Sequence, residues 1–257
     1  DGKLDAEIEI FFNKENLLDN FIARGFVSNL KVQVIQDFIL EKTSFNFFSD
    51  KSDILIKNLF SQNNFLKIEE GDLKVTVSPK IELESNFFTK INYNANKNNA
   101  RIINNLNTIK FISEFDANLN NSFKINFDKT FKVKSYSFKN SGKINKAASN
   151  FQKPLANKIF LEDITRVSIK DTEIEANYSK KESKLYLSGA YALNEKDFLP
   201  YELENRIKDR LLKSKINFDY KKGINLDFIN YFKSIENIAN IKLDLEKSNE
   251  DITFKKV

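Results

Sequence analysis

The chain has 257 residues, 41% hydrophobic and 13% aromatic, and a formal net charge of +5 from 41 basic and 36 acidic residues. So many aromatic residues exclude an intrinsically disordered chain. The two charge signs alternate along the sequence, which excludes the basic stripe that a nucleic-acid-binding surface needs. The chain contains no Cys and no His, which excludes disulfides, thiol nucleophiles, His-based triads and ordinary zinc sites.

The first third of the chain is predicted to form amphipathic strands. Residues 4–10 alternate Leu, Ala and Ile with Asp and Glu, and a period of two puts each set on one face of a strand. Similar patterns predict further strands around residues 25–34, 43–47, 54–60, 73–77 and 81–87. Strands that recur about every ten residues, with turn residues between them, are typical of an all-β fold.

The clearest amphipathic pattern lies between residues 121 and 144. Phe123, Ile125 and Phe127 alternate with polar residues, and a polar turn at residues 128–129 follows. Beyond the turn, the apolar residues are Phe131, Val133, Tyr136 and Phe138. The last two share a face with the first two only if Ser135 is an extra residue, which predicts a β-bulge.

Two stretches interrupt the meander. Residues 94–108 are rich in Asn and have apolar residues at helical spacing, which predicts a loop with a short helix. Residues 146–165 are irregular, and residues 158–165 have room for a helical turn. We see no linker, so we expect residues 1–257 to form one continuous segment.

The strand pattern resumes after residue 165. Strands are expected around residues 167–178, 185–193, 224–228, 241–245 and 252–254. Residues 201–215 fit either a helix or a strand pair, and we favour strands because residues 216–220 continue the same alternation. Four strands are expected to start just after a glycine, at Gly2, Gly71, Gly142 and Gly223.

No catalytic pattern is recognisable. There is no glycine-rich phosphate loop, and the neighbouring acids Glu69–Glu70 and Glu173–Glu175 lie in alternating strands, where solvated outer positions are the ordinary case. We therefore expect no enzyme activity, no catalytic residue, no metal and no cofactor.

The sequence also bears on topology. It contains no Met, so we expect that residue 1 is not a translation start and that the chain is part of a longer or processed protein. No apolar run approaches the ~18 residues that span a bilayer, so we expect this piece to be soluble or peripheral.

These strands resemble those of a known family. Long amphipathic meanders with units such as GDLKVTVSPKIELESNF, LYLSGAYAL and IANIKLDLEKS are similar to the AsmA-like superfamily, and more narrowly to the TamB and YhdP group of large bacterial envelope proteins. The resemblance implies a long, twisted antiparallel sheet, curled into a groove whose apolar interior carries phospholipid acyl chains between the inner and outer membranes. It further implies a periplasmic protein that maintains the envelope, with an upstream inner-membrane anchor and partner proteins in both membranes.

An open sheet must cover its apolar face with a second sheet, helices or lipid tails. If lipid is the cover, the groove-facing residues are expected to be Phe123, Ile125, Phe127, Phe131, Val133, Leu185, Leu187, Tyr191, Ile216 and Phe218. Their alternating partners should face water, namely Lys124, Asn126, Lys132, Lys134, Lys184 and Asn217. The alternative is a structural or adhesive β-repeat of a surface protein, in which the same apolar residues form a closed core.

Overall fold

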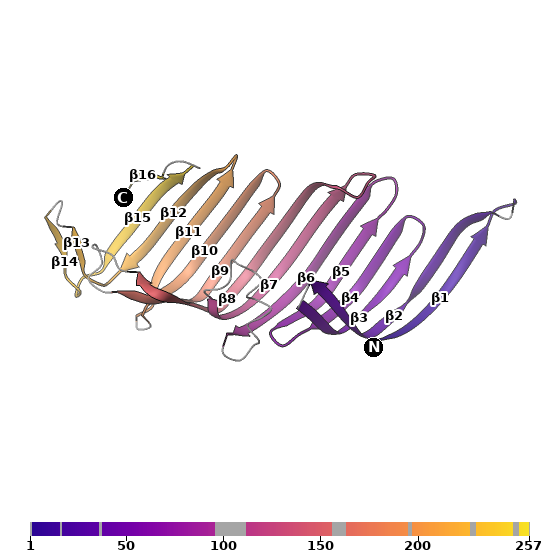
Figure 1. The fold of residues 1–257 in the computed structure, drawn as a ribbon, viewed down its shortest axis with the longest axis horizontal. Coiled ribbons are helices and arrows are strands. Elements are labelled where there is room, and N and C mark those ends of the chain that lie inside the picture. Colours follow the sequence, from indigo (N-terminus) through magenta and orange to yellow (C-terminus); the bar gives the residue numbers. More distant parts are fainter. Residues whose placement is uncertain are drawn as a thin grey trace.

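The protein folds as one long, open β-sheet (Figure 1). The computed structural model describes residues 2–15, 17–35, 38–95, 112–155, 163–194, 197–226, 230–248 and 252–256. The sheet has 14 strands, and each pairs antiparallel with the strand before and after it in the sheet; this order follows the sequence except that β15 comes next to β12. Their bounds are β1 (Lys3–Phe12), β2 (Leu18–Ile35), β3 (Phe38–Ser49), β4 (Asp53–Gln62), β5 (Leu66–Thr76), β6 (Ile81–Asn94), β7 (Ile112–Phe127), β8 (Val133–Leu155), β9 (Ile164–Ser179), β10 (Glu182–Leu193), β11 (Leu199–Lys208), β12 (Leu211–Tyr220), β15 (Ala239–Lys247) and β16 (Ile252–Lys256). This arrangement confirms the predicted all-β class and antiparallel order.

A small hairpin stands apart from the main sheet. Strands β13 (Ile224–Leu226) and β14 (Tyr231–Lys233) pair only with each other. The ammonium of Lys233 is buried beside this hairpin and donates to the carbonyl oxygens of Lys221, Lys222 and Ser234 at 2.9–3.0 Å. Burial lowers the pKa of this lysine. The predicted strand at residues 224–228 therefore exists in part, but as a side hairpin.

Short polar turns connect the strands, and their side chains hold the chain reversal. In the β3–β4 turn, Asp50 Oδ1 accepts hydrogen bonds from the backbone N–H groups of Ser52 and Asp53 at 2.7 and 2.8 Å. Asn63 does the same for Phe65 and Leu66 between β4 and β5. Asp and Asn favour turns because their side chains bond to backbone amides a few residues on.

A row of β-bulges crosses the first strands of the sheet. Asn29 in β2, Lys42 in β3, Asn58 in β4 and Glu70 in β5 have φ angles between 52° and 56°, and the pairing register shifts at each of them. Asp171 repeats the feature in β9, with φ of 48°. A bulge adds one unpaired residue and locally bends its strand, and four of these positions lie on four consecutive strands.

Two expected strand starts are wrong. Gly71 and Gly142 lie inside β5 and β8. Gly71 lies against Leu59 of the neighbouring strand, and Gly142 lies against the backbone of Asn118 and Leu119. A Cβ on Gly142 would lie 2.2 Å from the carbonyl oxygen of Asn118, and its φ is 152°. Only glycine fits such a close approach without strain, so this glycine marks crowding between strands.

The expected irregular stretch at residues 146–165 is also corrected. Strand β8 continues to Leu155 and β9 begins at Ile164, although the register is irregular between Asn150 and Leu155. Alanines at 147 and 148 weakened the apolar alternation that would have signalled a strand. Most of the helix expected at 94–108, and residues 158–162 of the expected helical turn, lie outside the described residues.

The remaining ambiguous segment is settled in favour of strands. Residues 201–215 fall in β11 and β12, which pair from Tyr201 opposite Phe218 to Lys208 opposite Leu211. The part of the chain that the structure describes contains no helix, so the predicted short helices are not found there.

The buried core is small and sits in the middle of the sheet. Ala117, Leu119 and Ile144 on β7 and β8 form its centre, with relative exposures of 1–7%. Only eleven apolar side chains among the described residues are buried. A sandwich of two sheets buries far more, because both inner faces contribute alternate residues.

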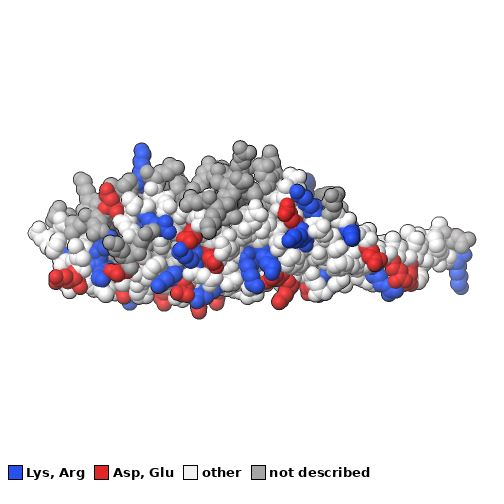
Figure 2. All heavy atoms as spheres, turned by 90° about the horizontal axis from the view of Figure 1, so that it is seen from below, with Lys and Arg blue, Asp and Glu red and all other residues white. Residues whose placement is uncertain are grey.

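Acidic and basic side chains are interspersed over the face seen in Figure 2. On the arm formed by β1 and β2, Arg24 pairs with Glu7 at 3.0 Å and with Glu9 at 3.3 Å. Exposed pairs of this kind contribute little to stability.

Candidate functional site

The strand register brings most of the predicted groove residues to one face of the sheet. Residues directly opposite each other in antiparallel strands share a face, which allows each face to be traced across the strands. One such row runs through Leu119, Gly142, Ile174, Leu187, Leu203, Ile216 and Leu243, on seven consecutive strands of the sheet. We call these seven residues the leucine row, and the side of the sheet that carries them the apolar face.

Nine of the ten predicted residues lie on the apolar face. Phe123, Ile125 and Phe127 follow Leu119 at even steps along β7, and Val133 pairs with Phe127. The other five alternate on β10 and β12, namely Leu185, Leu187, Tyr191, Ile216 and Phe218. The predicted bulge exists one position earlier than expected, because Lys134 is the unmatched residue between Val133 and Ser135.

Phe131 is the exception. It lies in the turn between β7 and β8, with φ of 59° and 68% of its surface exposed. Two backbone hydrogen bonds close this turn, from Asp128 N to Lys132 O and from Phe131 N to Asp128 O. The turn is therefore longer than the predicted two residues, and the prediction that Phe131 faces the groove from a strand is wrong.

The apolar face keeps accessible surface along most of its length. Ile125, Leu187, Ile216 and the other predicted strand residues on it are half-buried, and Val133 is exposed. Its centre, around Ala117 and Leu119, is buried, as are Tyr93, Ala176 and Tyr220 elsewhere on this face. This face therefore presents a strip of apolar side chains whose surface is still partly accessible to a ligand.

An aromatic cluster lies at one end of this strip. The ring of Tyr191 packs edge-on against Tyr201 and Phe218, with centroids 6.0 and 5.9 Å apart. The hydroxyl of Tyr191 donates to the carbonyl oxygen of Asp219 at 2.7 Å, and that of Tyr201 to Thr172 Oγ1 at 3.2 Å. Burial raises the pKa of both phenols, so they stay neutral donors, unsuited to acid–base chemistry at neutral pH.

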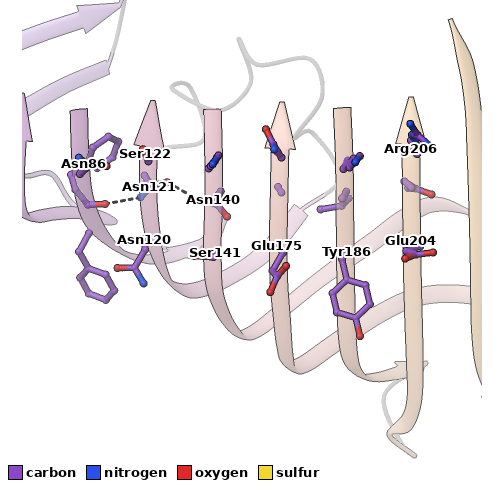
Figure 3. Close-up of a pocket in the computed structure, with 18 of the residues that line it drawn as sticks. Asn86, Asn120, Asn121, Ser122, Asn140, Ser141, Glu175, Tyr186, Glu204 and Arg206 are labelled. Carbon is purple, nitrogen blue, oxygen red and sulfur yellow. Dashed lines mark hydrogen bonds between the residues drawn. The ribbon is translucent and has the colours of Figure 1, made fainter. Parts of the chain in front are cut away.

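Two buried asparagines interrupt the apolar face, and sequence reasoning missed them. The side-chain amide of Asn140 donates to Asn121 Oδ1 at 2.8 Å, and that of Asn121 donates to the carbonyl oxygen of Leu119 and to Thr89 Oγ1, both at 3.1 Å. Figure 3 shows this pair between β7 and β8. Their amides satisfy each other and the neighbouring backbone, which makes them structural. The only sign of them in the sequence is that Asn121 and Asn140 lie two residues from Phe123 and Phe138, and therefore on the same face of the sheet.

The opposite face carries a hollow of about 1010 Å³ across β5 to β12 (Figure 3). Its charged lining residues include Lys139, Glu175 and Arg206, which alternate with the apolar-face residues on their strands. A second hollow of about 450 Å³ shares Tyr186 and Glu204 with it. Both hollows thus belong to the charged face, and neither is lined by a side chain of the aromatic cluster.

Carboxylates on the charged face are held by bases. Lys124 Nζ contacts Glu82 at 2.7 Å and Glu84 at 2.5 Å. The hydrogen bond from Lys124 lowers the pKa of Glu84, and those two glutamates raise the pKa of Lys124. Arg206 and Lys184 hold Glu182 in the same way and lower its pKa. Acids so engaged are poor general acids.

A third hollow of about 260 Å³ is lined by Tyr191 and Tyr220, among others. Among the described residues, no group of three or more His, Cys, Asp or Glu is arranged to hold a metal ion, and no helix in those ranges is long and apolar enough to cross a membrane. The apolar face is therefore the candidate site.

Comparisons of the chain with protein-family models, with curated proteins and with solved structures find no match.

Proposed function

We propose that this chain is a segment of an AsmA-like periplasmic protein whose apolar face binds the acyl chains of phospholipids and lets them pass between the inner and outer membranes. The observation that supports it is the leucine row, which crosses seven strands on one face. At roughly 4.8 Å per strand, six spacings extend about 29 Å. A strip of this length fits extended hydrocarbon chains.

The energetics favour hydrocarbon as the occupant. Each CH2 group that leaves water for an apolar surface gains about 0.8 kcal/mol, and no specific polar contact is needed. The half-buried state of Ile125, Leu187 and Ile216 leaves apolar surface for such contacts. A closed protein core would bury these side chains fully.

The finer part of the proposal is that the sheet curls into a groove around the acyl chains. Bulges at the same level of neighbouring strands would bend those strands together, which supports this part of the proposal. The bulges concerned are at the positive-φ residues Asn29, Lys42, Asn58 and Glu70. Small buried residues on the same face as the leucine row, such as Ser85 and Thr172, leave room for a bend toward that face.

The setting of the segment follows from the same proposal. It lies in the periplasm, tethered to the inner membrane by an upstream anchor and meeting protein partners at both membranes. Its role is to maintain the envelope by conducting lipid, without catalysis.

Site-specific photo-crosslinking in cells tests the proposal. A photo-crosslinking residue at position 125 or 187 should capture phospholipid, because both side chains lie on the apolar face. The controls are positions 139 and 184, two exposed lysines on the charged face. Equal capture from both faces, or no capture from either in a folded protein, would reject the proposal.

A further inference from the structure

Three neighbouring turns on one edge of the sheet share an unusual composition. They are residues 128–132 between β7 and β8, 180–181 between β9 and β10, and 209–210 between β11 and β12. Each connects an odd-numbered strand to the next even-numbered strand, so all three lie on the same edge, the upper one in Figure 1. We call these turns the hairpin rim.

The hairpin rim is basic. It carries five exposed bases, Lys129, Lys132, Lys180, Lys181 and Arg210, against the two acids Asp128 and Asp209. Among the described residues, no ion pair engages any of the five bases. Their charges therefore remain available to an external anion.

One of the two acids is turned inward. Asp128 Oδ1 accepts hydrogen bonds from the Thr130 hydroxyl and N–H, both at 2.7 Å, and from the Lys132 N–H at 3.0 Å. These bonds, that from the Thr130 hydroxyl first, lower the pKa of Asp128. The carboxylate is thus held against the turn backbone while the lysine side chains extend from it.

Apolar side chains lie exposed among these bases. Phe131 at the tip of its turn is 68% exposed, and Val133 beside it is 50% exposed. On the strands that end at the rim, Tyr136, Tyr178 and Ile207 are 38–48% exposed. An exposed Phe in a polar turn contributes nothing to the core, and contiguous exposed apolar groups mark interaction surfaces.

The same pairing of a base with an exposed apolar side chain recurs along this edge. In the β5–β6 turn Lys80 lies near Val77, which is 40% exposed. In the β1–β2 turn Lys14 lies near Leu17, which is 58% exposed. Successive turns on one edge are two strands apart, roughly 10 Å. The β3–β4 turn on this edge is an exception, because its Lys51 pairs with Asp19 at 4.0 Å.

We propose that the hairpin rim docks edge-on to the surface of a bilayer that contains anionic lipids. Lysine and arginine near such a surface are attracted to the headgroups, and exposed Phe, Tyr, Val and Ile enter the boundary between headgroups and acyl chains. A soluble polyanion would use the bases but would leave the apolar side chains in water. Val133, Tyr136, Tyr178 and Ile207 lie at the rim end of the apolar face. The five bases and Phe131 lie in the turns, so vesicle docking and acyl-chain binding can be measured separately.

Vesicle flotation of the full 257-residue chain tests the docking. Binding should be strong to vesicles of phosphatidylcholine and phosphatidylglycerol at 3:1, weak to pure phosphatidylcholine, and reduced by salt. The triple change Lys129→Glu, Lys132→Glu and Lys181→Glu should weaken binding at least ~100-fold, since each charge contributes roughly fivefold. The matched control, Lys139→Glu, Lys153→Glu and Lys242→Glu, changes net charge equally at exposed strand positions and should weaken it far less.

A fluorescence measurement separates insertion from charge attraction. The chain has no Trp, so Phe131→Trp adds a single indole, whose emission should shift to shorter wavelength on the anionic vesicles. Tyr186→Trp on the charged face should not shift. The docking would be overturned if the chain did not bind vesicles, or if the two triple variants lost binding equally. It would also be overturned if the Phe131→Trp emission did not shift and double-stranded DNA competed fully for binding.

Discussion

The middle of the sheet and its N-terminal arm carry the same sequence pattern with different outcomes. In β7, alternate residues such as Ala117 and Leu119 are 1% and 7% exposed. In β1, the equally regular Leu4 and Ile8 are 68% and 63% exposed, and all ten residues of the strand are exposed. Alternation therefore decides which face a side chain occupies, and neighbours decide whether it is buried.

The neighbours differ in two ways. Strand β7 lies between β6 and β8 over 14 or more paired residues, whereas β1 pairs only with β2. The strands around β7 also approach closely at Gly142 and at the bulge of Asp171. We therefore expect the central strands to contribute most of the stability, while β1 of the arm is held by β2 alone.

A carboxylate introduced into each region should give very different losses of unfolding free energy. Leu119→Asp puts an unpaired carboxylate into the buried centre, which we expect to cost about 4 kcal/mol or more of unfolding free energy. Ile8→Asp on the arm should cost under about 1 kcal/mol, because the side chain stays in water. Urea denaturation measures both, and equal losses would show that the arm is part of the same cooperative core.

A methyl group at two glycines should give the next largest contrast. Gly142→Ala is expected to lose about 2–3 kcal/mol, because its Cβ would overlap the Asn118 carbonyl in a backbone conformation with φ of 152°. Gly25→Ala meets a similar overlap with Asp5 O, at 2.1 Å, but β1 is an edge strand and has room to shift. We expect a loss below about 1 kcal/mol there. Thermal and urea unfolding of the two variants should rank them in this order, and the reverse ranking would contradict it.

The next prediction concerns the hydrogen bond between Asn121 and Asn140 in the centre of the sheet. Asn140→Ala removes the donor to Asn121 Oδ1 and leaves a buried acceptor unsatisfied, which should cost about 1–3 kcal/mol. Replacing both residues, Asn121→Leu with Asn140→Leu, removes donor and acceptor together and should recover part of that loss. A double variant less stable than the single one would mean that the pair has a role beyond hydrogen bonding.

The smallest expected effect concerns the ion pairs on the charged face. Lys124 lowers the pKa of Glu84 in the folded state, so this contribution to stability is present above the unfolded pKa of about 4.3. It is lost as the pH falls through the lower folded pKa. Lys124→Gln should therefore flatten the fall of unfolding free energy between pH 5 and pH 3, with little change in the fold. An unchanged slope in urea titrations across that range would contradict the assignment.

Much of the fold could be predicted because its signals are local. The alternation from Phe123 to Phe127 predicted which face of the sheet each residue occupies. The break in alternation near Ser135 predicted a bulge, which the structure has at Lys134. The bulges at Lys42, Asn58 and Glu70 had no such signal, since a left-handed residue within a strand depends on how its neighbours pair. Phe131 was misplaced because Phe is a strand residue by propensity, while the hydrogen bonds of Asp128 put it in a turn. The buried asparagines depend on contacts between distant strands, which alternation along one strand does not reveal.

We expect the apolar face to hold phospholipid, and the amount of phospholipid that stays bound to the purified protein is a direct measure of this binding. Purified from an envelope fraction and freed of membranes by ultracentrifugation, the wild-type chain should retain phospholipid that mass spectrometry quantifies per protein molecule. Ile125→Asp with Leu187→Asp should abolish it in a protein whose circular dichroism is unchanged, while Lys139→Asp with Lys184→Asp should retain it. A wild-type protein without phospholipid, equal amounts in both folded variants, or unfolding of the Ile125→Asp, Leu187→Asp variant alone would contradict the claim and favour a closed core.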